Sequence, residues 1–97
     1  MRLQIVTPEY VVFDAEVDVV TVPGKDGEFQ IMKDHAPIVA TLGEGTIKIK
    51  VHSDTFKDFD NASGKVYNSP ADQHTYLFDI KGGILEMNNN FISVLAS

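Results

Sequence analysis

The sequence contains no cysteine and no tryptophan, and it has few basic residues. Without cysteine, the chain cannot form a disulfide, use a thiolate nucleophile or bind a metal through a cysteine thiolate. It has 8 Lys and Arg residues against 14 Asp and Glu residues, which gives a formal net charge of −6. A chain with this charge is repelled by nucleic-acid phosphates and by anionic lipid. These absences argue against thiol chemistry and against nucleic-acid binding.

Long apolar runs are absent as well. No segment approaches the ~20 apolar residues of a membrane span. The first residues lead directly into a strand-like pattern, with neither an apolar signal segment nor an Arg/Ser-rich transit peptide. We therefore expect a soluble protein of a reducing compartment, or one whose leader has been removed. The 97 residues make one domain, which can bury about 60–65% of the surface of the unfolded chain.

Apolar residues alternate with period 2 along most of the chain, and no segment shows a convincing period of 3.6. The clearest case is residues 46–51, in which isoleucine or valine alternates with threonine or lysine. Short strand-like runs recur about every 8–12 residues, with turn signals between them. This pattern predicts an all-β fold, a flattened β-sandwich or barrel of about ten short strands.

The rest of the chain is organised around residues 20–37. The segment opens as a valine-rich strand, and we expect Pro23 and Gly24 to break its ladder because proline has no amide hydrogen to donate and glycine tolerates a positive φ. A second turn signal and a second alternating run follow, and the segment closes in a polar loop fixed by a proline. Two strands should therefore present Glu28 and His35 near one edge of the sheet.

Residues 52–74 differ in composition from the rest of the chain, since Asp, Asn, Ser, Gly and Pro dominate. They contain too little apolar surface to form a second core. We predict a long variable hairpin or loop at 52–74, after which regular strand pairing resumes at Thr75. The chain would then be one domain, residues 1–97, with a surface excursion.

Glu28 and His35 allow several interpretations. An acid–base pair is one, since imidazole titrates near neutral pH, but the sequence identifies no nucleophile or pocket to go with it. A metal site built from His35, His52 and His74 would need three distant segments to converge, and their spacing is not typical of ligands. The glycines are not in a strand–loop–helix context, so they do not indicate a phosphate site. We therefore predict no catalytic, cofactor-binding or metal residue. Two interpretations of Glu28 and His35 remain: they are solvated loop residues, or they contact another protein.

Three segments occur in a fixed order: TPEYVVFDAEVDVVTVPGKDGEFQIMKDHAP, GTIKIK and GGILEMNNNFISVL. Together they resemble the N-terminal β-sandwich domain of the epsilon subunit of F-type ATP synthase, over residues 3–49 and 80–96. The resemblance implies a non-catalytic subunit of the central rotor stalk that binds the gamma subunit and the c-ring. It also implies a peripheral position on the cytoplasmic face of the bacterial inner membrane. It places Glu28 and His35 on the side of the c-ring.

The sequence departs from the family pattern in several places. Gln30 replaces the usual glycine, and Lys33-Asp34 stands where many members have proline followed by a small or polar residue. The segment 52–74 is longer than the usual hairpin. Typical members continue into a C-terminal helical hairpin, which binds ATP in some of them, whereas this sequence ends at Ser97. We therefore expect the chain to bind no ATP and to support coupling without inhibition by such a hairpin.

The alternative from another functional class is a free-standing β-sandwich binding module, of the adhesin or carbohydrate-binding kind. Carbohydrate binders usually present aromatic side chains on an exposed face. Here tryptophan is absent and most aromatic residues fall at positions that should face inward. The composition therefore favours the rotor subunit over the binding module.

Overall fold

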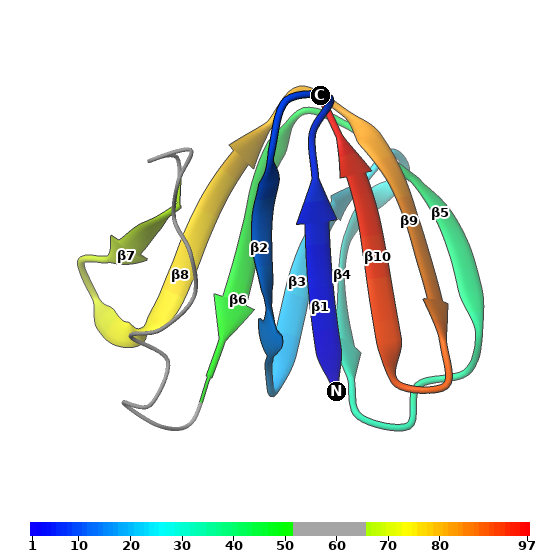
Figure 1. Cartoon of the computed structure of the whole chain (residues 1–97), viewed down its shortest axis with the longest axis horizontal. Coiled ribbons are helices and arrows are strands. Elements are labelled where there is room, and N and C mark those ends of the chain that lie inside the picture. The colour runs from blue at the N-terminus through cyan, green and yellow to red at the C-terminus, as the bar shows by residue number, and fades with distance from the viewer. Residues whose placement is uncertain (52–65) are drawn as a thin grey trace.

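The computed structural model of the chain describes residues 1–51 and 66–97, and every regular element in them is a β-strand (Figure 1). The strands are β1 (Arg2–Val6), β2 (Val11–Glu16), β3 (Val19–Gly24), β4 (Gly27–Met32), β5 (Ile38–Leu42), β6 (Gly45–Lys50), β7 (Tyr67–Ser69), β8 (Asp72–Ile80), β9 (Gly83–Asn88) and β10 (Phe91–Ala96). The predicted all-β fold is confirmed, with 10 strands. No helix in the described part of the chain is long and apolar enough to cross a membrane.

The strands form one curled sheet whose two halves act as the layers of a sandwich. The first layer has the order β2-β1-β10-β9-β5, and the second has the order β4-β3-β6-β8-β7. Among the described residues, the pairing of Gly24 with Leu42 joins β3 to β5 and so connects the layers. Figure 1 shows β1 and β10 of the first layer in front of β3 and β4 of the second.

The first and last strands of the chain lie side by side. β1 and β10 run parallel, with Leu3 opposite Ile92 and Ile5 opposite Val94. The other described pairings are antiparallel. This parallel pair joins the first and last strands of the chain within the first layer.

The hydrophobic core lies between the two layers and follows the period-2 pattern. On β6, Ile47 and Ile49 are fully buried, whereas Lys48 and Lys50 are exposed. Removal of such apolar side chains from water is the main force that holds the layers together. The largest fully buried side chains are Phe13, Leu3, Ile5, Ile31, Ile47, Ile49, Leu85, Met87, Ile92, Val12, Val20 and Val22.

The prediction that Pro23 and Gly24 break the strand ladder is wrong, although β3 does end at Gly24. β3 continues through both residues, and Pro23 pairs with Glu28 across the β3–β4 hairpin. Proline lacks an amide donor but keeps its carbonyl acceptor, and the Pro23 carbonyl accepts a hydrogen bond from the Gly43 amide at 2.8 Å. Glycine is needed at position 24, since a Cβ atom there would lie 2.6 Å from the carbonyl oxygen of Gly27.

Regular pairing resumes at Tyr67, inside the predicted excursion and earlier than the predicted Thr75, because β7 pairs with β8 and Tyr67 is opposite Leu77. The Asp72 carboxylate accepts hydrogen bonds from the His74 amide at 2.9 Å and from the Thr75 hydroxyl at 3.2 Å, which fixes the start of β8. The bond from the His74 amide is the main cause that lowers the pKa of Asp72, against an opposing effect of desolvation. Of the predicted excursion, residues 52–65 lie outside the described residues, and β7 and the start of β8 lie in the remainder.

Candidate protein-binding surfaces

The structure does not bring Glu28 and His35 together. Glu28 lies at the tip of the β3–β4 hairpin, whereas His35 follows the opposite end of β4. The strand from Glu28 to Met32 alone spans about 13 Å at ~3.3 Å per residue. In Figure 1 the hairpin tip lies at the upper end of the sandwich and the loop that carries His35 lies at the lower end. Glu28 lies in the edge strand β4 and His35 lies in the loop that follows it, and the two residues do not form an acid–base pair.

Glu28 lines a shallow hollow of about 540 Å³ between the hairpin tip, residues 24–29, and residues 39–41 of β5. Its Oε2 atom lies 3.8 Å from Nζ of Lys48, and both side chains are exposed. An ion pair between exposed side chains contributes only ~0–1 kcal/mol. The Glu28 carboxylate therefore remains available to a charged or polar partner.

His35 lies in the loop between β4 and β5, where its side chain is exposed. Its Nδ1 atom lies 2.6 Å from the carbonyl oxygen of Ala36. Of the other two histidines in the metal hypothesis, His74 lies on β8, and His52 lies outside the described residues. In the part of the chain that the structure describes, no group of three or more His, Asp or Glu residues could hold a metal ion.

A polar cluster ties the short strand β7 to its neighbours. The Thr46 hydroxyl donates a hydrogen bond to Oδ1 of Asp79 at 2.7 Å, and the Tyr67 hydroxyl donates to the same atom at 3.1 Å. Desolvation, together with the bond to Asp79, raises the pKa of Tyr67. The cluster connects β6, β7 and β8, and we assign it a structural role.

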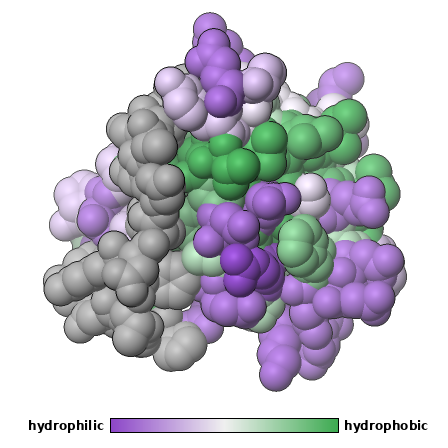
Figure 2. Space-filling model, viewed as in Figure 1, coloured by the Kyte–Doolittle hydropathy of each residue, from purple (hydrophilic) through white to green (hydrophobic). Residues whose placement is uncertain are grey.

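Four apolar side chains form a row across the outer face of the first layer, and we call this row the apolar strip. It consists of Val11, Val6, Leu95 and Ile84, which are opposite one another on β2, β1, β10 and β9. The exposed fractions are 51% for Val11, 59% for Leu95 and 54% for Ile84. Figure 2 shows a hydrophobic band across the upper part of this face, between hydrophilic regions. Exposed apolar side chains that gather in this way commonly mark a protein contact.

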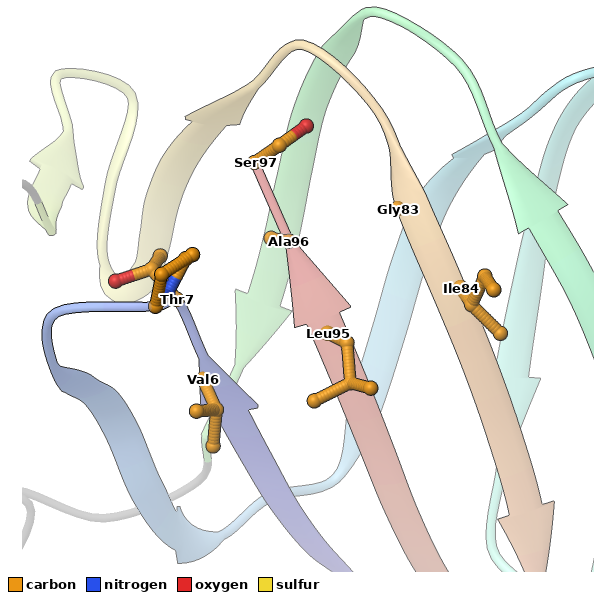
Figure 3. Close-up of a pocket in the computed structure, with 8 residues that line it drawn as sticks. Val6, Thr7, Gly83, Ile84, Leu95, Ala96 and Ser97 are labelled. Carbon is orange, nitrogen blue, oxygen red and sulfur yellow. The ribbon is translucent and has the colours of Figure 1, made fainter.

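A hollow of about 400 Å³ lies on the apolar strip near the upper end of the sandwich. Figure 3 shows the Leu95 side chain between those of Val6 and Ile84, with Thr7 and Ser97 at the margin. Gly83 also lines the hollow. The hollow contains few polar groups to orient a small substrate, so its chemistry suits an apolar side chain of another protein.

The apolar strip is continuous with the hollow that contains Glu28. Thr41 of β5 is opposite Ile84 in the sheet, and it also lines the Glu28 hollow. Val39, which is 72% exposed, lines the same hollow. The upper end of the sandwich therefore presents one surface with an apolar part and a polar part.

Sequence reasoning missed the apolar strip because it assumed that outward positions are polar. A signal was present in the runs Val11-Val12-Phe13, Ile84-Leu85 and Val94-Leu95, in which consecutive residues are apolar. In a strand, consecutive side chains point to opposite faces. Such runs therefore place an apolar residue on the outside as well as one in the core.

Comparison with known proteins identifies the family. The profile of the ATP synthase delta/epsilon chain β-sandwich domain matches residues 1–59. The ATP synthase epsilon chain of Chlorobium limicola is 39% identical over 89 residues, which cover 92% of this chain and 80% of that protein. This chain belongs to the ATP synthase epsilon family.

Two other epsilon chains are similar in sequence to this chain over nearly its whole length. The ATP synthase epsilon chain of Caulobacter vibrioides is 32% identical over 96 residues, which cover 99% of this chain and 88% of that protein. That of Desulforamulus reducens is 38% identical over 95 residues, and the match covers 98% of this chain. The chain spans only 57% of the length of the latter relative.

Solved structures agree on the fold of this epsilon-family chain. A chain in the cryo-EM structure of the Euglena gracilis mitochondrial ATP synthase aligns with a TM-score of 0.69 and 16% identity, over 97% of this chain and 48% of that chain. A chain of the central stalk and c-ring of the Tetrahymena thermophila mitochondrial ATP synthase aligns with a TM-score of 0.64 and 16% identity, over 99% and 62% of the two chains. The resemblance found in the sequence is confirmed.

Proposed function

We propose that this epsilon-family chain is a non-catalytic subunit of the central stalk of F-type ATP synthase and that it links the gamma subunit to the c-ring. Membership of the family supports this role, and the continuous surface at the upper end of the sandwich carries it. The subunit would hold gamma on the ring, so that rotation of the ring is delivered as torque. The densely packed core suits this task because packed interiors resist deformation.

We assign the apolar strip to gamma and the tip of the β3–β4 hairpin to the polar loops of the c-ring. Apolar side chains gain most from a partner that also buries apolar surface, whereas an exposed carboxylate such as Glu28 suits basic or polar loops. A subunit that ties two touching partners together needs its two contacts close to each other. The strip and the Glu28 hollow meet this condition, but His35 at the lower end does not.

The proposed location is peripheral, on the cytoplasmic face of a bacterial inner membrane, as part of the ATP synthase. The relatives that match over most of their own length come from bacteria, which supports this location. No cofactor is assigned to the chain.

A free-standing binding module is the weaker interpretation. A carbohydrate-binding module usually presents several aromatic side chains on one exposed face. Among the described residues no such face exists, since the exposed aromatic side chains belong to separate elements. Tyr10 lies in the β1–β2 turn, Tyr67 lies on β7, and Phe91 begins β10. Tyr67 is also engaged with Asp79.

Single substitutions at the two ends of β4 test the ring contact. We expect Glu28→Ala to weaken binding to purified c-ring about 2–5-fold, the size of one exposed charged contact. His35→Ala should leave ring binding unchanged, because His35 lies at the other end of the sandwich. Both variants should fold normally and bind gamma like the wild type, since exposed polar substitutions usually change stability by less than about 0.5 kcal/mol.

The pair of variants also serves as its own control. A loss of ring binding in His35→Ala alone would move the ring contact to the lower end. Equal ring binding by both variants and the wild type would overturn the assignment of the hairpin tip to the ring.

A further inference from the structure

Two loops at the lower end of the sandwich are joined by a reciprocal pair of hydrogen bonds. The backbone amide of Asp34 donates to Oδ1 of Asn90 at 2.7 Å, and Nδ2 of Asn90 donates to Oδ1 of Asp34 at 2.9 Å. Asn90 is itself anchored to β1, because its carbonyl oxygen accepts a hydrogen bond from the Arg2 amide at 2.9 Å. The loop between β4 and β5 is thereby fastened to the β9–β10 turn.

Both residues have a backbone conformation that most side chains avoid. The φ angle is 65° at Asp34 and 61° at Asn90. Residues with a Cβ atom are disfavoured in this left-handed region, although Asn and Asp tolerate it better than others. Glycine would adopt the same φ freely, but it has no side chain to make the observed bonds. The presence of Asp and Asn at these two turn positions is therefore explained by the bonds between them.

The position of this pair in the fold gives it a mechanical consequence. The loop 33–37 carries the chain from β4 in the second layer to β5 in the first layer, whereas the β9–β10 turn belongs to the first layer. At the upper end, the layers are linked by the Lys25 amide, which donates to the Thr41 carbonyl oxygen at 2.9 Å. The bonds between Asp34 and Asn90 make the corresponding link at the lower end.

We propose that Asp34 and Asn90 form a latch that fastens the β4–β5 loop to the first layer and fixes the conformation of the loop that carries His35. The latch restrains the crossing between the layers at the end opposite the apolar strip. In the proposed rotor role, the latch would help the sandwich to resist shear while torque passes through it. Only this consequence rests on the proposed function. The latch itself is a property of the isolated chain.

Glycine substitutions separate the hydrogen bonds from the backbone conformation. Asp34→Gly removes one bond, since the amide of residue 34 can still donate to Asn90, whereas Asn90→Gly removes both. We expect Asn90→Gly to lower the melting temperature by about 4–8 °C and Asp34→Gly to lower it less. The double variant should match Asn90→Gly alone, because nothing remains for the second change to remove.

Asn89→Gly is the matched control. Asn89 has a φ angle of 51° and is the neighbour of Asn90, but it takes no part in the latch. Asn89→Gly should leave the hydrogen exchange rate of the Asp34 amide unchanged. Asn90→Gly should accelerate this exchange at least about tenfold, as expected for an amide that loses its acceptor. Equal effects of the two asparagine variants on melting and on this exchange would overturn the latch, as would full additivity of Asp34→Gly and Asn90→Gly.

An exchange of the two side chains provides a rescue. Asn90→Asp alone places a second carboxylate against that of Asp34 and removes the donor, so it should lower the melting temperature at pH 7. The double variant Asp34→Asn/Asn90→Asp restores one donor and one acceptor in reversed roles, and it should recover most of the loss. Failure of the exchange to recover stability would contradict the latch. These measurements use the chain without gamma or c-ring, so their result is independent of the rotor role.

Discussion

Replacement of Gly83 by alanine should destabilise the chain by about 2–3 kcal/mol and lower its melting temperature by roughly 10–20 °C. A Cβ atom at this position would overlap the carbonyl oxygen of Leu95 and would lie 3.2 Å from Cα of Ala96. Both atoms belong to the backbone of β10, so no side-chain rotation can relieve the overlap. β9 and β10 would have to move apart where Gly83 is opposite Ala96.

Gly82→Ala is the matched control for Gly83→Ala. A Cβ atom at Gly82 would have its nearest contact at 3.4 Å, to the carbonyl oxygen of Leu42, which is an ordinary contact distance. We expect this variant to stay within about 1 kcal/mol of the wild type. Thermal and urea unfolding measure both variants. Equal stabilities of the two would show that β9 and β10 are not packed as closely as described.

The double variant Ile84→Thr/Leu95→Thr should weaken binding to gamma by about 30-fold or more. The two side chains are opposite each other in the apolar strip and both line its hollow, and apolar anchors that are buried in a pocket of an interface typically contribute ~2 kcal/mol or more. Threonine keeps the strand propensity of the site while it replaces apolar surface with a hydroxyl group. The isolated variant should fold normally, since Ile84 and Leu95 are 54% and 59% exposed.

The control for the strip variant lies on the same two strands and the same face. Glu86 and Ser93 are opposite each other, and each lies two residues along its strand from Ile84 or Leu95. Glu86→Thr/Ser93→Thr introduces the same cross-strand threonine pair but removes no apolar surface, so it should bind gamma within about threefold of the wild type. A surface-binding assay with purified gamma compares the two. Equal weakening in both double variants would remove the apolar strip from the interface.

The fold was accessible from the sequence because most of its strands have one buried face. Ile47 and Ile49 alternate with Lys48 and Lys50, and this alternation identifies both a strand and its inward side without knowledge of its partners. The co-linear order of such strands and their turns also carried the resemblance to the epsilon family. Both signals are local, and the structure agrees with both.

The parts that sequence reasoning missed depend on contacts between distant residues. The parallel pairing of β1 with β10 and the latch between Asp34 and Asn90 each join segments that are far apart in the sequence. No local pattern specifies them. The separation of Glu28 from His35 was accessible in principle, because an extended strand between two residues keeps them apart by its own length.

Site-specific photo-cross-linking in the assembled ATP synthase tests the central claim most directly. A photoreactive amino acid is placed at the position of Leu95 or of Glu28, and the cross-linked partner is identified by mass spectrometry. We predict that the probe at Leu95 captures gamma and that the probe at Glu28 captures a c-ring subunit, because the strip and the hairpin tip form one surface that bridges the two. Capture of neither rotor partner from these two positions, in a complex that contains the chain, would contradict the account.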